Sequence, residues 1–314
     1  MERLWRAMNL RNKDIISIRD LDKREIEIIL EKAKEMERVV SAGKSLDVMK
    51  GKVLANLFFE PSTRTRFSFA SAMNRLGGSV IGFEEIKSTS MVKGETLTDM
   101  IKVVEKYSDL IVIRHPKEGT ARLAAEISSK PVINAGDGAN QHPTQTLLDL
   151  YTIQNLKGGI KDLNIALVGD LKYGRVMKSL AYALAMFGAN LTMVSPIGLE
   201  MPKEIVSELV RKFDANIIQT DNILSGVKNA DVLYVCRIQK ERFEDAYEAE
   251  KTEKNFRITP EVVKKANEDM IILHALPKVT EIDAAVDGMT NAKYFEQTFF
   301  GVPVRMALIS LVGL

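Results

Sequence analysis

Residues 53–66 read V-L-A-N-L-F-F-E-P-S-T-R-T-R, and this stretch decides the fold. A short apolar run ends at Glu60 and Pro61, and hydroxyl residues and two arginines follow at once. Short continuous apolar runs are typical of strands in a buried parallel sheet. Proline and small hydroxyl residues favour the first turn of a helix. The stretch therefore predicts a buried strand that leads directly into a helix.

The predicted helix start is a candidate anion site. Free backbone N–H groups and the positive end of the helix dipole suit a phosphate there, and the arginines add forked donors. The alternative is an ordinary capped helix with solvated arginines, and the preceding strand favours the phosphate site. The candidate phosphate-binding residues are Ser62, Thr63, Arg64 and Thr65.

Apolar strands alternate with helical patterns along the rest of the chain. In the first half the predicted strands cover residues 53–59, 79–83, 110–114 and 131–135. After Gly158-Gly159 the alternation restarts, with predicted strands at residues 164–169, 191–195, 216–220, 231–236 and 270–274. This alternation predicts an α/β protein of two doubly wound parallel-sheet domains, with the active site in the interdomain cleft.

The predicted domain boundary lies at the connecting helix. We place the first domain at residues 1–143, with a closing C-terminal helix at 303–314 that packs back on it. The second domain then covers residues 144–302 and includes the connecting helix. Asp22 and Glu25 have the spacing of a capping box and predict an early packing helix.

The composition excludes several classes of function. Lys and Arg number 44 against 42 Asp and Glu, so the net charge of +2 predicts neither a nucleic-acid partner nor a membrane partner. Cys236 is the single cysteine and the first residues are polar, so we expect a cytoplasmic protein. Neither zinc-ligand spacing nor a P-loop is present, and the G-x-G-x-x-G spacing fails. We expect no metal and no cofactor.

Polar side chains gather where the predicted strands end, which is where doubly wound sheets bind ligands. In the first half these are Arg114, His142 and Gln145, and in the second half Lys172, Arg175, Arg237, Gln239 and Arg242. Such a set suits a substrate pair with several negative charges. For the histidine the alternative is a packed side chain, and for Arg237 and Arg242 it is a weak surface salt bridge. We interpret Glu60 as orienting Arg175 or Arg242 rather than as a base.

Five motifs together resemble the catalytic chains of the aspartate carbamoyltransferase family, over essentially the whole chain. They are F-F-E-P-S-T-R-T-R at 58–66, R-H-P at 114–116, N-A-G-D-G-A-N-Q-H-P-T-Q at 134–145, G-D-L-K-Y-G-R at 169–175 and R-I-Q-K-E-R at 237–242. The resemblance implies transfer of the carbamoyl group from carbamoyl phosphate to the amine of L-aspartate. The products would be N-carbamoyl-L-aspartate and phosphate, in pyrimidine biosynthesis.

The resemblance also implies residue roles. Carbamoyl phosphate would bind Ser62, Thr63, Arg64, Thr65, Arg114, His142, Gln145, Ala275 and Leu276, of which Arg64, Thr65, Arg114 and His142 would be catalytic. Aspartate would bind Lys93, Lys172, Arg175, Arg237 and Gln239, and domain closure would involve Glu60 and Arg242. Ser90 and Lys93 would come from an adjacent subunit, which implies a homotrimer with shared active sites. A separate zinc-containing regulatory chain is a further partner that the resemblance raises.

The chain departs from the family pattern at the loop after residue 274. His274-Ala275-Leu276-Pro277-Lys278 stands where relatives usually have H-P-L-P-R, and Leu276-Pro277 is a candidate cis bond. The loop at 88–93 is one residue shorter than in relatives and has one lysine where they often have two. Two other functions stay open: an ornithine carbamoyltransferase, which typically shows H-C-L-P at this loop, and a non-catalytic homologue that serves as a binding partner.

Overall fold

In the computed structural model, residues 10–85, 87, 89–238 and 254–314 are described. Their contacts divide the chain into two compact units. Unit 1 comprises Met1–Tyr151 with Thr298–Leu314, and unit 2 comprises Thr152–Gln297. The divisions fall within α6 (Pro143–Lys157) and α12 (Tyr294–Gly313), so each of these helices begins in one unit and ends in the other. The sequence had suggested a boundary at residue 143, where α6 begins.

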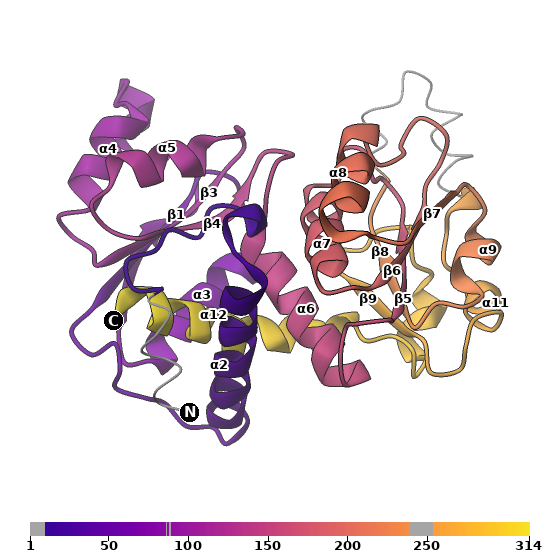
Figure 1. The fold of residues 1–314 in the computed structure, drawn as a ribbon. Helices are drawn as coiled ribbons and strands as arrows, with labels where there is room; N and C mark the ends of the chain where they lie inside the picture. Colours follow the sequence, from indigo (N-terminus) through magenta and orange to yellow (C-terminus); the bar gives the residue numbers. More distant parts are fainter. Residues whose placement is uncertain (1–9, 86, 88, 239–253) are drawn as a thin grey trace. The chain divides into compact units, whose positions relative to one another are not determined.

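Unit 1 is built on a four-stranded parallel sheet with the order β2-β1-β3-β4. Its strands are β1 (Val53–Phe58), β2 (Ser79–Phe83), β3 (Leu110–His115) and β4 (Val132–Asp137). Helices α4 (Leu97–Val104) and α5 (Thr120–Ile127) cover one face, and α3 (Thr63–Arg75) and α12 cover the other (Figure 1). The strand that opens the sequence argument is thus β1, in the middle of the sheet.

Burial differs between the two edge strands of this sheet, β2 and β4, because Ile15 pairs with Ile133 along the outer edge of β4. Every residue of β3 and β4 is buried, because these strands have helices on both faces. Strand β2 lies at an edge and is largely exposed in this chain. Helix α2 (Lys23–Ser41) carries the predicted capping box: Asp22 Oδ1 accepts from the Glu25 N–H at 2.8 Å, and the Asp22 N–H donates to Glu25 Oε2 at 3.0 Å.

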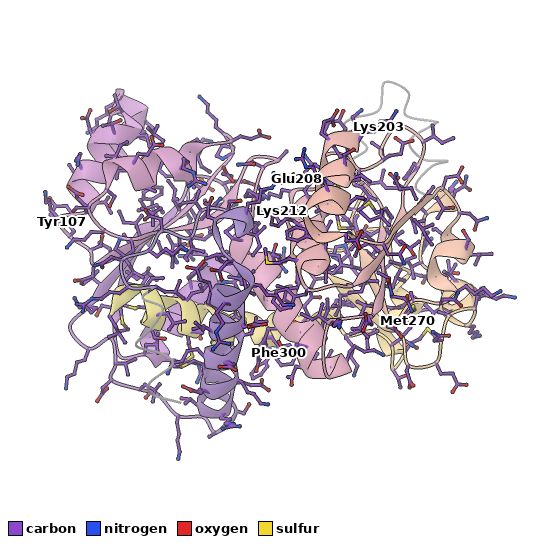
Figure 2. All side chains as sticks on the ribbon, viewed as in Figure 1. Tyr107, Lys203, Glu208, Lys212, Met270 and Phe300 are labelled. Carbon is purple, nitrogen blue, oxygen red and sulfur yellow. The ribbon has the colours of Figure 1, made fainter. Side chains whose placement is uncertain are left out.

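Unit 2 is built on a five-stranded parallel sheet with the order β7-β6-β5-β8-β9. Its strands are β5 (Asn164–Val168), β6 (Asn190–Val194), β7 (Ile217–Thr220), β8 (Val232–Val235) and β9 (Ile271–His274). One face carries α7 (Arg175–Met186) and α8 (Lys203–Phe213), and the other carries α9 (Ile223–Val227) and α11 (Pro260–Val263), as Figure 1 shows. Figure 2 marks Lys203, Glu208 and Lys212 along α8. The prediction of two doubly wound parallel sheets is confirmed.

Helix α12 corrects one prediction: it begins at Tyr294, whereas the expected start was Pro303, which lies inside the helix. An interior proline costs about 3 kcal/mol because it removes a backbone hydrogen bond. Burial of apolar side chains such as Val304, Met306 and Leu308 offsets that cost. Although α12 is long and apolar enough to cross a membrane, 67% of its apolar window is buried within the chain. Phe300, for example, packs edge-on against Tyr151 of α6 (Figure 2).

Short 3-10 helices complete the secondary structure of the described residues. They are η1 (Ile18–Asp20), η3 (Ser90–Lys93) and η5 (Ala284–Gly288).

Candidate active site

The start of α3 forms the first part of the site. Ser62 is the N-cap residue, and within the described chain its side chain makes no capping hydrogen bond, so the first-turn N–H groups stay open to a ligand. Arg64 lies in that turn on the exposed side, and partial desolvation lowers the pKa of its guanidinium. Thr65 is buried beside it. The predicted anion-binding residues therefore share one helix turn.

Arg114 lies at the end of β3, beside this turn. It pairs in register with Phe58, the last residue of β1, so the carboxyl ends of β1 and β3 lie side by side. Its Nη1 donates to the Ala135 carbonyl at 3.1 Å, and its Nη2 lies 2.9 Å from Glu60 Oε1. These contacts fix a nearly buried guanidinium next to the α3 start. Within unit 1 Glu60 thus contacts Arg114. Its contact with Arg175 or Arg242 stays a prediction, because Arg175 belongs to unit 2 and Arg242 lies outside the described residues.

His142 ends the turn between β4 and α6, Gln145 lies in the first turn of α6, and both are buried. A hydrogen-bond network on Asp137 holds this turn: Asp137 Oδ1 accepts from Asn134 Nδ2 at 2.9 Å and from the Gln141 N–H at 3.1 Å. Since β4 pairs with β3, this turn lies beside Arg114 at the carboxyl ends of the strands. The structure therefore brings together the unit 1 residues predicted to hold carbamoyl phosphate.

Ser90 and Lys93 lie in a different environment. Both are exposed on η3, where Ser90 Oγ contacts Glu95 and Gly94 ends the helix in the left-handed region with φ of 94°. Among the described residues of this chain, no hydrogen bond joins Ser90 or Lys93 to the first turn of α3. Their exposure leaves them accessible to another molecule.

In unit 2 the turn after β5 positions Lys172 and Arg175. Gly169 has φ of 121°, and a Cβ there would lie 2.1 Å from the Cys236 carbonyl oxygen, so this position requires glycine. Asp170 is fully buried, and its Oδ1 accepts from the N–H groups of Lys172 and Tyr173 at 3.1 and 2.8 Å. The turn ends where α7 starts at Arg175.

Arg237 follows β8 and is half-buried at the same edge of the unit 2 sheet. The other two residues predicted in this segment, Gln239 and Arg242, lie outside the described residues. Burial is the main cause that raises the pKa of the Cys236 thiol to about 12, which disfavours the reactive thiolate form. In the described part of the chain, no group of three or more His, Cys, Asp or Glu side chains could hold a metal ion.

The loop after β9 is held by a buried histidine and a buried acid. The Leu276 N–H donates to His274 Nδ1 at 2.7 Å, so Nδ1 is an acceptor and the proton is on Nε2, which lies 2.8 Å from Glu281 Oε1. Leu276 adopts φ of 56°, a strained conformation for a branched residue, and the Leu276–Pro277 peptide is cis. The two carbonyls predicted to hold the carbamoyl amide, of Ala275 and Leu276, belong to this loop, which the Leu276 N–H anchors to His274.

Sequence reasoning missed two acids that support the site. Asp149 accepts from Gln145 Nε2 at 2.8 Å, and Glu281 contacts His274. The first could have been found from its i, i+4 spacing on a predicted helix. The second lies in a loop, where spacing gives no signal.

Two family descriptions match the sequence. Residues 13–155 match "Aspartate/ornithine carbamoyltransferase, carbamoyl-P binding domain", and residues 161–312 match "Aspartate/ornithine carbamoyltransferase, Asp/Orn binding domain". The chain belongs to the aspartate/ornithine carbamoyltransferase family. The first match covers the α3, β3 and α6 residues of the site, and the second covers most of unit 2 and continues into the part of α12 that belongs to unit 1.

Individual members of the aspartate/ornithine carbamoyltransferase family are similar over nearly their full length. The "Aspartate carbamoyltransferase catalytic subunit" of Thermococcus kodakarensis is 55% identical, with 97% of this chain and 98% of that protein covered. The catalytic subunit of M. jannaschii aspartate transcarbamoylase has a TM-score of 0.90 at 50% identity, covering 95% and 97% of the chains. The Trypanosoma cruzi enzyme, solved with carbamoyl phosphate and aspartate, has a TM-score of 0.91 at 35% identity, with 96% of each chain covered.

Proposed function

We propose that this protein transfers the carbamoyl group of carbamoyl phosphate to the amine of L-aspartate, giving N-carbamoyl-L-aspartate and phosphate. One observation carries the proposal: the α3 turn, Arg114 and His142 converge on one sheet edge in a chain 55% identical to an aspartate carbamoyltransferase catalytic subunit. The retention of the whole set also disfavours a non-catalytic homologue. Pyrimidine biosynthesis is the pathway that this reaction would serve.

The phosphate half of the substrate would bind at the start of α3. Backbone N–H groups and the hydroxyls of Ser62, Thr63 and Thr65 can donate to phosphate oxygens, and Arg64 adds a charged fork. Arg114, fixed by Glu60 and the Ala135 carbonyl, costs little reorganisation when a ligand binds. Charge that builds on the departing phosphate is then met by donors that are already in place.

The carbamoyl carbonyl would be polarised by Arg114, Thr65 and His142. When the aspartate amine attacks the carbonyl carbon, the N–C bond forms as the C–O bond to phosphate breaks, and negative charge passes from the carbonyl oxygen to phosphate. Preorganised donors favour that transition state over the ground state. A phosphate oxygen can take the amine proton, so the reaction requires no protein base.

The second substrate is a dicarboxylate in this proposal. Arg175 and Arg237 follow β5 and β8 in unit 2, and guanidinium groups suit carboxylates. Lys172, Gln239 and Lys93 would complete the aspartate site, and Glu60 and Arg242 would take part in domain closure over both substrates. Ornithine carries a cationic side chain and fits this set less well, and residue 275 is alanine where ornithine enzymes typically have cysteine.

Phosphate release from carbamoyl phosphate tests the reaction directly, with aspartate, ornithine or no acceptor. We expect turnover with aspartate alone. The Arg64→Ala variant should lose at least about a hundredfold in kcat while its circular dichroism spectrum stays unchanged, because a fixed oxyanion donor contributes that much. Turnover with ornithine alone, or with neither amine, would contradict the proposal.

We further propose a homotrimer in which Ser90 and Lys93 complete the site of a neighbouring subunit. Their exposure on η3 supports this arrangement. Mixing inactive Lys93→Ala and Arg64→Ala proteins under subunit-exchange conditions should restore activity, since some mixed sites would then contain both native residues. Absence of recovery, with exchange verified by native mass, would count against shared sites.

Two further parts of the proposal concern context. The relatives' name, "catalytic subunit", supports a separate regulatory chain, which by family resemblance would carry zinc. The single cysteine supports a cytoplasmic location. Native mass of the protein purified from its own cells tests the first, and cell fractionation tests the second.

A further inference from the structure

The orientation of the Gln145 amide is fixed by a buried acid. Gln145 Nε2 donates to Asp149 Oδ1 at 2.8 Å, one turn further along α6, and Asp149 is fully buried. Asp149 Oδ1 accepts this hydrogen bond, so the amide nitrogen of Gln145 faces the carboxyl group. The amide oxygen, Oε1, is then turned away from Asp149, and no described residue donates a hydrogen bond to it.

A buried cation accompanies this acid. Arg305 of α12 is 3% exposed, its Nη1 donates to the Gly301 carbonyl at 3.2 Å, and its guanidinium lies 5.0 Å from the centre of the Phe69 ring. Burial lowers the pKa of Arg305 to about 10, and the charge of Asp149 opposes that fall. Arg305 therefore stays charged at neutral pH and places a buried positive charge near the Asp149 carboxyl group.

The substrate offers a donor that this arrangement would recognise. A carbamoyl group ends in an NH2 group with two N–H donors, whereas an acetyl group of nearly the same shape ends in a methyl group with none. An amide free to rotate could present either its oxygen or its nitrogen. With the nitrogen bound to Asp149, Gln145 presents only an acceptor, which matches NH2 and leaves a methyl group unpaired.

We propose that Asp149, through its hydrogen bond from Gln145, is a positioning residue that turns the Gln145 oxygen toward the carbamoyl NH2 group and so selects carbamoyl phosphate over other acyl phosphates. This inference rests on the proposed function and deepens it. Asp149 acts through Gln145 and does not touch the substrate itself. A purely structural role for the buried pair is the alternative.

Three ligands separate these roles: carbamoyl phosphate, acetyl phosphate and inorganic phosphate. Asp149→Asn keeps the shape of the side chain but lets the Gln145 amide adopt both orientations. We expect it to lower the ratio of carbamoyl-phosphate to acetyl-phosphate affinity by about tenfold, the effect of one hydrogen bond, with phosphate affinity unchanged. The matched control is Thr146→Val, which alters the neighbouring buried residue, whose Oγ1 has no hydrogen-bond partner among the described residues. It should leave all three affinities unchanged.

A double-mutant cycle tests whether Asp149 acts through Gln145. In a Gln145→Ala background, Asp149→Asn should no longer change the affinity ratio. An unchanged ratio in Asp149→Asn, an equal loss for all three ligands, or an effect that persists without Gln145 would each overturn the inference. If Asp149→Asn alone does not fold, the double variant Asp149→Asn/Arg305→Met, which removes the buried cation as well, takes its place. Failure of the proposed function would show separately, as a wild-type protein that releases no phosphate with aspartate.

Discussion

Glu281→Gln tests how the buried acid holds the loop after β9. Burial alone would raise the pKa of Glu281, but hydrogen bonds from His274 and from the Val279 N–H outweigh it and lower the pKa from 4.5 to about 2. One pKa unit corresponds to about 1.4 kcal/mol. The ionised side chain therefore contributes about 3 kcal/mol to the free energy of unfolding at neutral pH.

The sign of the pH dependence follows from the lowered pKa. The contribution is complete at a pH well above 4.5, the ordinary value, and is lost as the pH falls through 4.5 toward 2. Glutamine keeps the shape of the side chain but never ionises. The variant should thus be less stable than the wild type by about 3 kcal/mol at pH 7, and by about half that amount near pH 3.

Urea unfolding followed by circular dichroism at both pH values measures this difference. Glu204→Gln, at an exposed position of α8 in the same unit, is the control and should change stability by less than about 0.5 kcal/mol. A deficit in Glu281→Gln that is the same at pH 7 and pH 3 would refute the reasoning. So would a deficit at pH 7 no larger than that of the control.

Three further changes have defined outcomes. Gly169→Ala should lower the thermal midpoint of the protein markedly, by a cost of about 3 kcal/mol, because its Cβ would lie 2.1 Å from a backbone oxygen; an unshifted calorimetric midpoint would contradict this. Asp22→Ala should cost about 1 kcal/mol in urea unfolding through loss of the α2 cap, and Asp22→Asn much less. Cys236, with a thiol pKa of about 12, should react with iodoacetamide at pH 8 about a thousandfold more slowly than a free thiol, and at the ordinary rate once the protein is unfolded.

Strand positions and strand-end residues can be predicted from the sequence because they depend on local patterns. The run before Glu60 is apolar except for Asn56, and β1 is indeed a central, buried strand. Ligand sites in parallel sheets lie at the carboxyl ends of the strands, so the sequence predicts that Ser62 and Arg114 belong to the same site.

The sequence does not predict in the same way which charged residues are buried. Asp149 and Arg305 influence each other across a sequence separation of about half the chain, and nothing local marks either residue as buried. The start of α12 was misplaced for a similar reason: proline signals a helix start locally, whereas the apolar packing that carries the helix through Pro303 is a tertiary effect. Edge exposure of β2 also depends on strand order, which the pattern of apolar residues does not encode.

The discontinuity of unit 1 bears on how the chain is made. Its sheet comes from the first half of the sequence, yet α12 returns to it last: the Asn12 N–H donates to the Val312 carbonyl at 2.9 Å, and Arg305 lies against Phe69. A ribosome releases the chain from the N-terminus onward, so unit 2, one continuous stretch, can fold while unit 1 still waits for its closing helix. The half of the protein that begins first in translation is therefore finished last, and an incomplete nascent chain lacks the buried Arg305 that lies against Phe69 of α3.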